Sequence, residues 1–132
     1  MADAKDIQGT VFRDGSATLL ARVVGADAAA IVQADISTIT YTVYLLDQAD
    51  PDSGTLVTGH SAVACAVADT IFDTLQDDDL WTDDALGYNF RHVLAVAANP
   101  AFATAGRNYR IVFTLTPVAG EVILVRFRLF CI

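Results

Sequence analysis

The chain has 132 residues, a length that suits one domain whose core needs neither a disulfide nor a metal. Its net charge of -8 argues against nucleic-acid binding, because an acidic surface repels phosphate backbones. No run approaches the roughly 18 consecutive apolar residues of a membrane span, and residues 1–6 lack the layout of a signal peptide. We therefore expect a single domain over residues 1–132 that is made in the cytoplasm and binds no membrane.

The composition is apolar for a small domain. Hydrophobic residues make up 54% of the chain and charged residues 18%, where about a quarter is typical. Alanine supplies part of the hydrophobic fraction and adds little apolar area. Even so, the composition favours an oligomer in which part of the surface is buried.

The first half of the chain alternates apolar and polar residues, the period of β-strands. We expect strands at residues 9–12, 17–24 and 36–46, and one or two more within residues 55–67. Asp14-Gly15 predicts a turn. Residues 25–35 and 47–54 are expected to be loops.

The period changes at Asp69. There Ile71, Phe72 and Leu75 fit one face of a helix, so a short helix is expected near residues 69–76. An acidic loop at residues 77–84 follows, and a strand resumes at Tyr88.

The last quarter of the chain reads as a long antiparallel hairpin with a turn at residues 117–120. In its second strand, the face opposite the expected core set is not wholly polar. That face contains Val122, Leu124, Arg126, Arg128 and Phe130. Either the rest of the same domain or a partner subunit covers it. With about seven short strands and no βαβ alternation, the chain is expected to be an all-β sandwich.

The segment Ala105-Gly106-Arg107-Asn108-Tyr109 resembles the entry to the sixth strand of immunoglobulin-like domains. The resemblance implies that Tyr109 forms a tyrosine corner, in which its hydroxyl binds the backbone a few residues upstream. The chain lacks the paired cysteines and central tryptophan of antibody domains. It therefore resembles the wider group of immunoglobulin-like antiparallel sandwiches.

A short acidic sandwich of this kind, with a Pro-x-x-Gly hairpin before its last strand, also resembles small accessory proteins of tailed-phage virions. The resemblance implies a non-enzymatic structural protein located in the virion, most simply a capsid decoration protein. It also implies a homo-oligomer, with a trimer favoured, that contacts the major capsid protein or another virion protein. The alternatives are a tail or baseplate component, and a carbohydrate- or receptor-binding module that uses Trp81 and Tyr88.

The acidic loop suggests calcium, because carboxylates are the ligands that Ca²⁺ prefers. Its spacing does not match an EF-hand, so a solvated loop or a contact for arginines of a neighbouring copy is the preferred interpretation. Trp81 within this loop either plugs the end of the sandwich or anchors a partner.

Catalytic and cofactor motifs are missing from the sequence. His60 and His92 accompany no nucleophile elbow, phosphate loop, CxxC or HExxH. Cys65 and Cys131 lie in apolar stretches, which predicts reduced thiols. We therefore expect no enzyme activity, no cofactor and no metal. The expected partner-contact residues are Trp81, Val122, Leu124, Arg126, Arg128 and Phe130.

Overall fold

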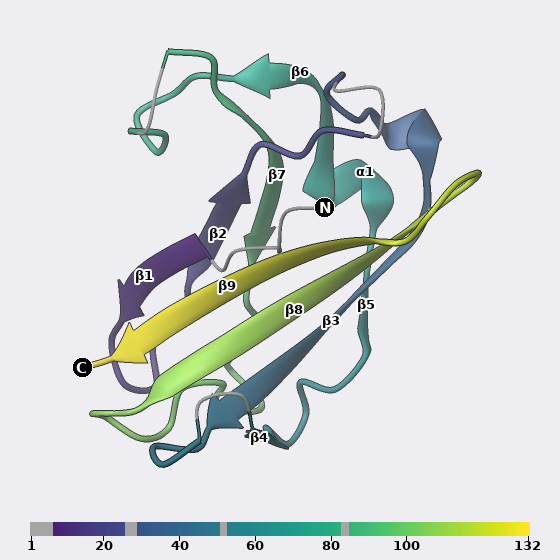
Figure 1. Ribbon diagram of the computed structural model, residues 1–132. Coiled ribbons are helices and arrows are strands. Elements are labelled where there is room, and N and C mark those ends of the chain that lie inside the picture. The colour runs from purple at the N-terminus through teal and green to yellow at the C-terminus, as the bar shows by residue number, and fades with distance from the viewer. Residues whose placement is uncertain (1–6, 26–28, 51–52, 83–84) are drawn as a thin grey trace.

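The computed structural model describes residues 7–25, 29–50, 53–82 and 85–132. Its strands pack as two sheets, one in front of the other (Figure 1). The first sheet has the order β1-β9-β8-β3-β4, and β5 also pairs with β3. The second sheet has the order β2-β7-β6.

The bounds of the elements follow the alternation of the sequence. The first sheet consists of β1 (Ile7–Val11), β3 (Ile36–Leu46), β4 (Gly54–Leu56), β5 (Val63–Cys65), β8 (Asn108–Pro117) and β9 (Ile123–Cys131). The second consists of β2 (Thr18–Ala21), β6 (Ile71–Gln76) and β7 (Tyr88–Val93). The helical elements are η1 (Gln33–Asp35) and α1 (Val67–Thr70). Among the described residues, none of the helices is long and apolar enough to cross a membrane.

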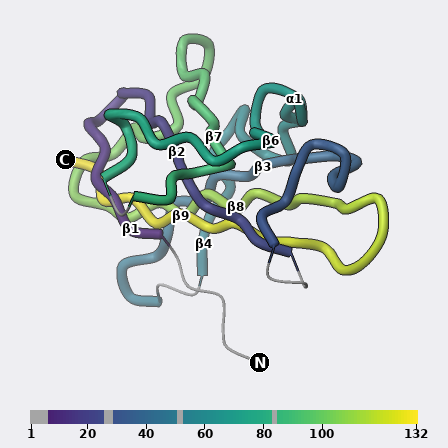
Figure 2. The backbone as a smooth tube through the Cα atoms, turned by 90° about the horizontal axis from the view of Figure 1, so that it is seen from above, coloured from purple at the N-terminus to yellow at the C-terminus, as the bar shows by residue number. Residues whose placement is uncertain are grey.

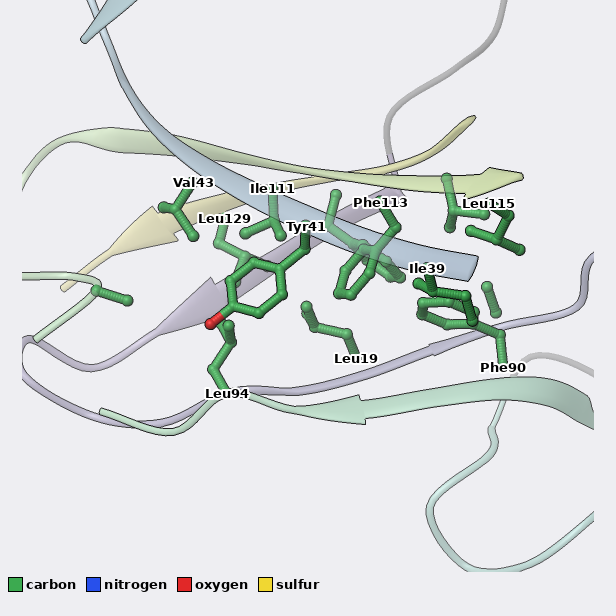
Figure 3. Close-up of a cluster of buried hydrophobic side chains, with 14 of the residues drawn as sticks. Leu19, Ile39, Tyr41, Val43, Phe90, Leu94, Ile111, Phe113, Leu115 and Leu129 are labelled. Atoms are coloured by element: carbon green, nitrogen blue, oxygen red, sulfur yellow. The ribbon is translucent and has the colours of Figure 1, made fainter. Parts of the chain in front are cut away.

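The core lies between the two sheets (Figure 3), and the long strands β8 and β9 contribute every second residue to it. The sequence predicted the inward residues of β8 correctly, and all are buried: Tyr109, Ile111, Phe113 and Leu115. In β9 the predicted set is also turned inward: Val125, Phe127, Leu129 and Cys131 are buried, and Ile123 is partly buried. Because the side-chain period is 2, the intervening residues of both strands must point to the outer face.

One pair of strands departs from the expected antiparallel arrangement. β1 runs parallel to β9, with Ile7 opposite Phe127 and Val11 opposite Cys131. These strands come from opposite ends of the chain, so no hairpin requires them to be antiparallel. The sandwich is therefore antiparallel except at this edge, and it contains nine strands among the described residues rather than about seven.

The prediction of a helix near residues 69–76 is wrong in its position. The helical turn is α1, which ends at Thr70, and residues 71–76 form strand β6. Ile71 is fully buried and pairs with Phe90 of β7. A single helical turn is marginal on its own, whereas a strand gains ladder bonds and core packing. Tertiary pairing therefore overrides the local pattern.

A buried amide holds the connection between β2 and β3 against the second sheet. The Asn89 side chain, 1% exposed, accepts a hydrogen bond from the Val23 backbone N–H at 2.7 Å. It also donates to the carbonyls of Val23 and Ile31, at 2.9 and 3.1 Å. This role could not be predicted from the sequence, because the alternation of the strand places Asn89 among the residues expected to face away from the core.

The tyrosine corner implied by the resemblance is present. The Thr104 backbone N–H donates to the Tyr109 hydroxyl at 3.0 Å, and the Tyr109 ring meets Phe102 edge-on at 5.3 Å. Gly106, between them in sequence, has φ +82°, a left-handed conformation that favours glycine. The two-sheet strand order makes the chain an all-β sandwich, and the corner is a feature that it shares with immunoglobulin-like domains.

Replacing Tyr109 with phenylalanine tests the corner. The change removes the acceptor of the part-buried hydrogen bond from the Thr104 N–H, so we expect the free energy of unfolding to fall by about 0.5–1.5 kcal/mol. Urea unfolding followed by circular dichroism measures it. Tyr44→Phe on the outer face is the matched control and should change stability by less than about 0.5 kcal/mol. Equal stability of the two variants would show that the corner bond contributes nothing.

Candidate functional site

The candidate site is the outer face of the first sheet, where β9 turns four of the predicted contact residues away from the core. Leu124 and Phe130 are 50% and 42% exposed, and Arg126 and Arg128 are half-buried. The residues between them are buried in the core, so these four side chains must point away from it. The structure thus brings Leu124, Arg126, Arg128 and Phe130 together on one face.

Strands β8 and β3 add side chains to this face. Arg110 lies directly opposite Arg128, and Val112 lies opposite Arg126. Tyr44 of β3 is in turn opposite Arg110. We call the outward side chains of β8 and β9, together with Tyr44, the arginine face. Its third arginine, Arg110, was missing from the predicted contact set although strand parity already placed it opposite the core.

The arrangement concentrates positive charge on an acidic protein. Seven of the eight basic residues are arginines, and three of them lie on this one face. Like charges directly opposite each other on neighbouring strands destabilise a sheet by a few tenths of a kcal/mol. A hollow of about 280 Å³ lies among them, lined by Tyr44, Leu46, Gly54, Arg110, Val112, Leu124 and Arg126. The face is therefore suited to an anionic group flanked by apolar contacts.

Val122 lies elsewhere. It precedes β9 and lines a larger apolar groove of about 690 Å³, between the β8–β9 turn and the chain around Ile31. Val24 and Val118 line the same groove and are exposed, as is Val122. The structure therefore assigns Val122 to a different hollow from the arginine face.

Trp81 is also separate from that face. It is half-buried, with its ring 5.9 Å from that of Tyr88. It lines an opening of about 370 Å³ between β1 and β2, and the core residues Leu19 and Leu129 also line this opening. The two roles expected for Trp81, a plug of the sandwich and an anchor for a partner, both stay predictions.

Hydrogen bonds give one residue of the acidic loop, Asp78, a structural role. Asp78 accepts from the Leu80 backbone N–H at 3.0 Å and from the Tyr88 hydroxyl at 2.7 Å. Burial is the first cause of the raised pKa of Tyr88, and its bond to Asp78 is the second. Within the described part of the chain, no three potential metal-ligating side chains of His, Cys, Asp or Glu gather, while Asp83 and Asp84 lie outside the described residues.

The two histidines belong to one aromatic cluster around Tyr41. His60 is buried, with Nδ1 2.9 Å from the Tyr41 hydroxyl and Nε2 2.7 Å from the Asn99 carbonyl oxygen. Both ring nitrogens are thus engaged in structural bonds. The ring of His92 lies 5.2 Å from that of Tyr41 and 5.4 Å from that of Phe113.

Both cysteines are free thiols, as the sequence predicted. Burial raises the pKa of Cys65 to about 11 and also raises the pKa of Cys131. Cys65 and His92 line a hollow of about 430 Å³ with Asp69 and Arg91. At neutral pH the Cys65 thiol is protonated and a poor nucleophile, so the hollow holds no activated thiolate.

Comparisons of the chain with protein-family models, with curated proteins and with solved structures each found no match. The functional argument therefore depends on the geometry of the chain itself.

The pH dependence of stability tests the environment of His92. Burial lowers the pKa of His92. Just below pH 6.5, His92 is therefore protonated in the unfolded chain but still neutral in the folded chain. Above pH 6.5 the titration of His92 costs no stability. As the pH decreases from there, the free energy of unfolding falls until the pH reaches the lowered pKa of His92 in the folded chain. One proton contributes at most about 1.4 kcal/mol per pH unit.

Urea unfolding at pH 7.5 and pH 5.5 measures the effect. His92→Phe keeps an aromatic ring and removes the titration, so its stability should change less between the two pH values than that of the wild type. If the two proteins lose stability equally, the acid sensitivity comes from other groups and the assignment to His92 is wrong.

Proposed function

We propose that the chain is a non-enzymatic structural protein of a phage-type virion, a capsid decoration protein that stabilises the shell by protein–protein contacts. The observation that carries the proposal is the arginine face. It is a broad sheet surface with apolar and cationic side chains on a chain whose net charge is -8.

The chemistry of the face is that of a protein interface. Interface cores are enriched in aromatic residues and arginine and depleted in other charged residues. Here Phe130 and Leu124 are exposed beside Arg126 and Arg128, and Tyr44 lies across β8 from them. A sheet face that exposes both kinds of side chain around a hollow of only about 280 Å³ suits another protein better than a small molecule, which takes a deep concave pocket.

The charge of the face indicates the kind of partner. Arginines on an otherwise acidic protein bind carboxylates, often with two parallel hydrogen bonds. The partner surface would therefore be acidic, on the major capsid protein or on another copy of this chain. A homo-oligomer, with a trimer favoured, would use the same face.

A tail or baseplate component would use the arginine face in the same way, so the location in the particle separates the two roles. A carbohydrate- or receptor-binding module built on Trp81 and Tyr88 is less well supported. Tyr88 is only 1% exposed, so of the two residues expected in that site only Trp81 offers its ring to a sugar.

Purified particles of the virus that encodes the chain provide the test. Decoration predicts the protein in these particles at a copy number set by the shell subunits, measured by quantitative mass spectrometry. Recombinant protein should also rebind to particles from which it has been stripped. Arg128→Glu and Leu124→Asp should each weaken rebinding by at least about tenfold, since both place a carboxylate in the contact.

Arg13→Glu is the matched control, with the same charge change at an exposed turn residue between β1 and β2. It should rebind as the wild type does, and circular dichroism should show that all three variants are folded. Absence of the protein from the particles, or normal rebinding of Arg128→Glu and Leu124→Asp, would contradict the proposal.

A further inference from the structure

The arginine face has a complementary surface on the same chain. Strand β6 and the turn after it carry exposed Asp73, Asp77 and Asp79. Exposed Leu75 and Leu80 lie within two residues of these aspartates in the sequence. We call these five residues the acidic surface. It combines negative charge with apolar side chains, as the arginine face combines positive charge with apolar side chains.

The two surfaces belong to different layers of the sandwich. The acidic surface is on β6, in the second sheet, and on the turn that follows it (Figure 1). Figure 2, turned by 90°, again places β6 apart from β4, β8 and β9. The arginines project from the first sheet away from the second, because Ile111, Phe127 and Leu129 fill the space between the sheets.

A two-fold contact between two arginine faces is disfavoured by charge. A two-fold axis places the same patch of both copies together, so Arg110, Arg126 and Arg128 would meet their own counterparts. Like charges placed against each other at an interface weaken the contact. Contact between the arginine face of one copy and the acidic surface of another pairs opposite charges instead.

We propose that this chain self-associates head to tail, with the arginine face of one copy bound to the acidic surface of the next. The inference rests on the proposed function in one respect, the use of the arginine face as a contact surface. A head-to-tail contact closes into a ring if its rotation allows, and otherwise continues as a filament. A closed ring of three is the form that the expected trimer would take.

Mixing two variants tests the head-to-tail contact. The face variant carries Arg110→Glu and Arg128→Glu, and the acid variant carries Asp77→Lys and Asp79→Lys. Each has lost one half of the contact, so each should be monomeric by analytical ultracentrifugation. An equimolar mixture should associate again, because the acid variant still offers its arginine face to the acidic surface of the face variant, and the introduced glutamates and lysines also attract each other.

Wild-type protein should form the head-to-tail ring or filament in about 0.05 M salt. In about 0.5 M salt, where surface charges are screened, its dissociation constant should be at least tenfold higher. Arg13→Glu combined with Glu121→Lys is the control, with charge reversals at exposed residues outside both surfaces, and should keep the wild-type mass. Should the reversal variants fail to fold, Arg128→Gln and Asp79→Asn weaken the same contact with smaller changes.

Three results would overturn the inference: a monomeric wild type at low salt, variants that keep the wild-type mass, or a mixture that stays monomeric. The last would mean that both variants damage one shared surface. These outcomes are distinct from failure of the proposed function. A monomeric protein that still rebinds to particles would leave the decoration role standing, whereas head-to-tail dimers without particle binding would leave only the self-association.

Discussion

The structure depends on the packing of Phe113 between the two sheets. Its ring lies 4.8 Å from that of Phe90 and 5.4 Å from that of His92, both in the second sheet. Tyr41 and Phe127, from the two strands that flank β8, contact it at 5.6 and 5.8 Å. Phe113 therefore joins four aromatic partners from both layers, and it is fully buried. Aromatic contacts of this kind add to the free energy gained from apolar burial.

The same core determines the functional surface. With Ile111 and Phe113 turned inward, Arg110 and Val112 must point outward, because successive side chains alternate across a strand. A slip of one residue between β8 and β9 would exchange the faces of one strand and bury charge in the core. The arginine face is therefore tied to the burial of its neighbours. A contact built on it depends on a sheet register that the core stabilises.

Some features were predicted from the sequence, and others needed pairing over long distances. Alternation identified the hairpin and its inward residues, and the resemblance pointed to the hydroxyl bond of Tyr109. The pattern at residues 71–76 predicted a helix, and pairing with β7 made these residues a strand instead. Asn89 bonds to Val23 and Ile31, 66 and 58 residues away, so no local signal could show its role.

By itself, the sequence determined that the chain forms a β-sandwich and that Leu124, Arg126, Arg128 and Phe130 share one face of a strand. That much follows from the period of the side chains, which is a local property. Only the tertiary structure decided that Arg110 lies opposite Arg128, that Val122 and Trp81 line other hollows, and that β1 runs parallel to β9. These facts depend on register and on packing between distant segments, where burial and backbone pairing outweigh local preference.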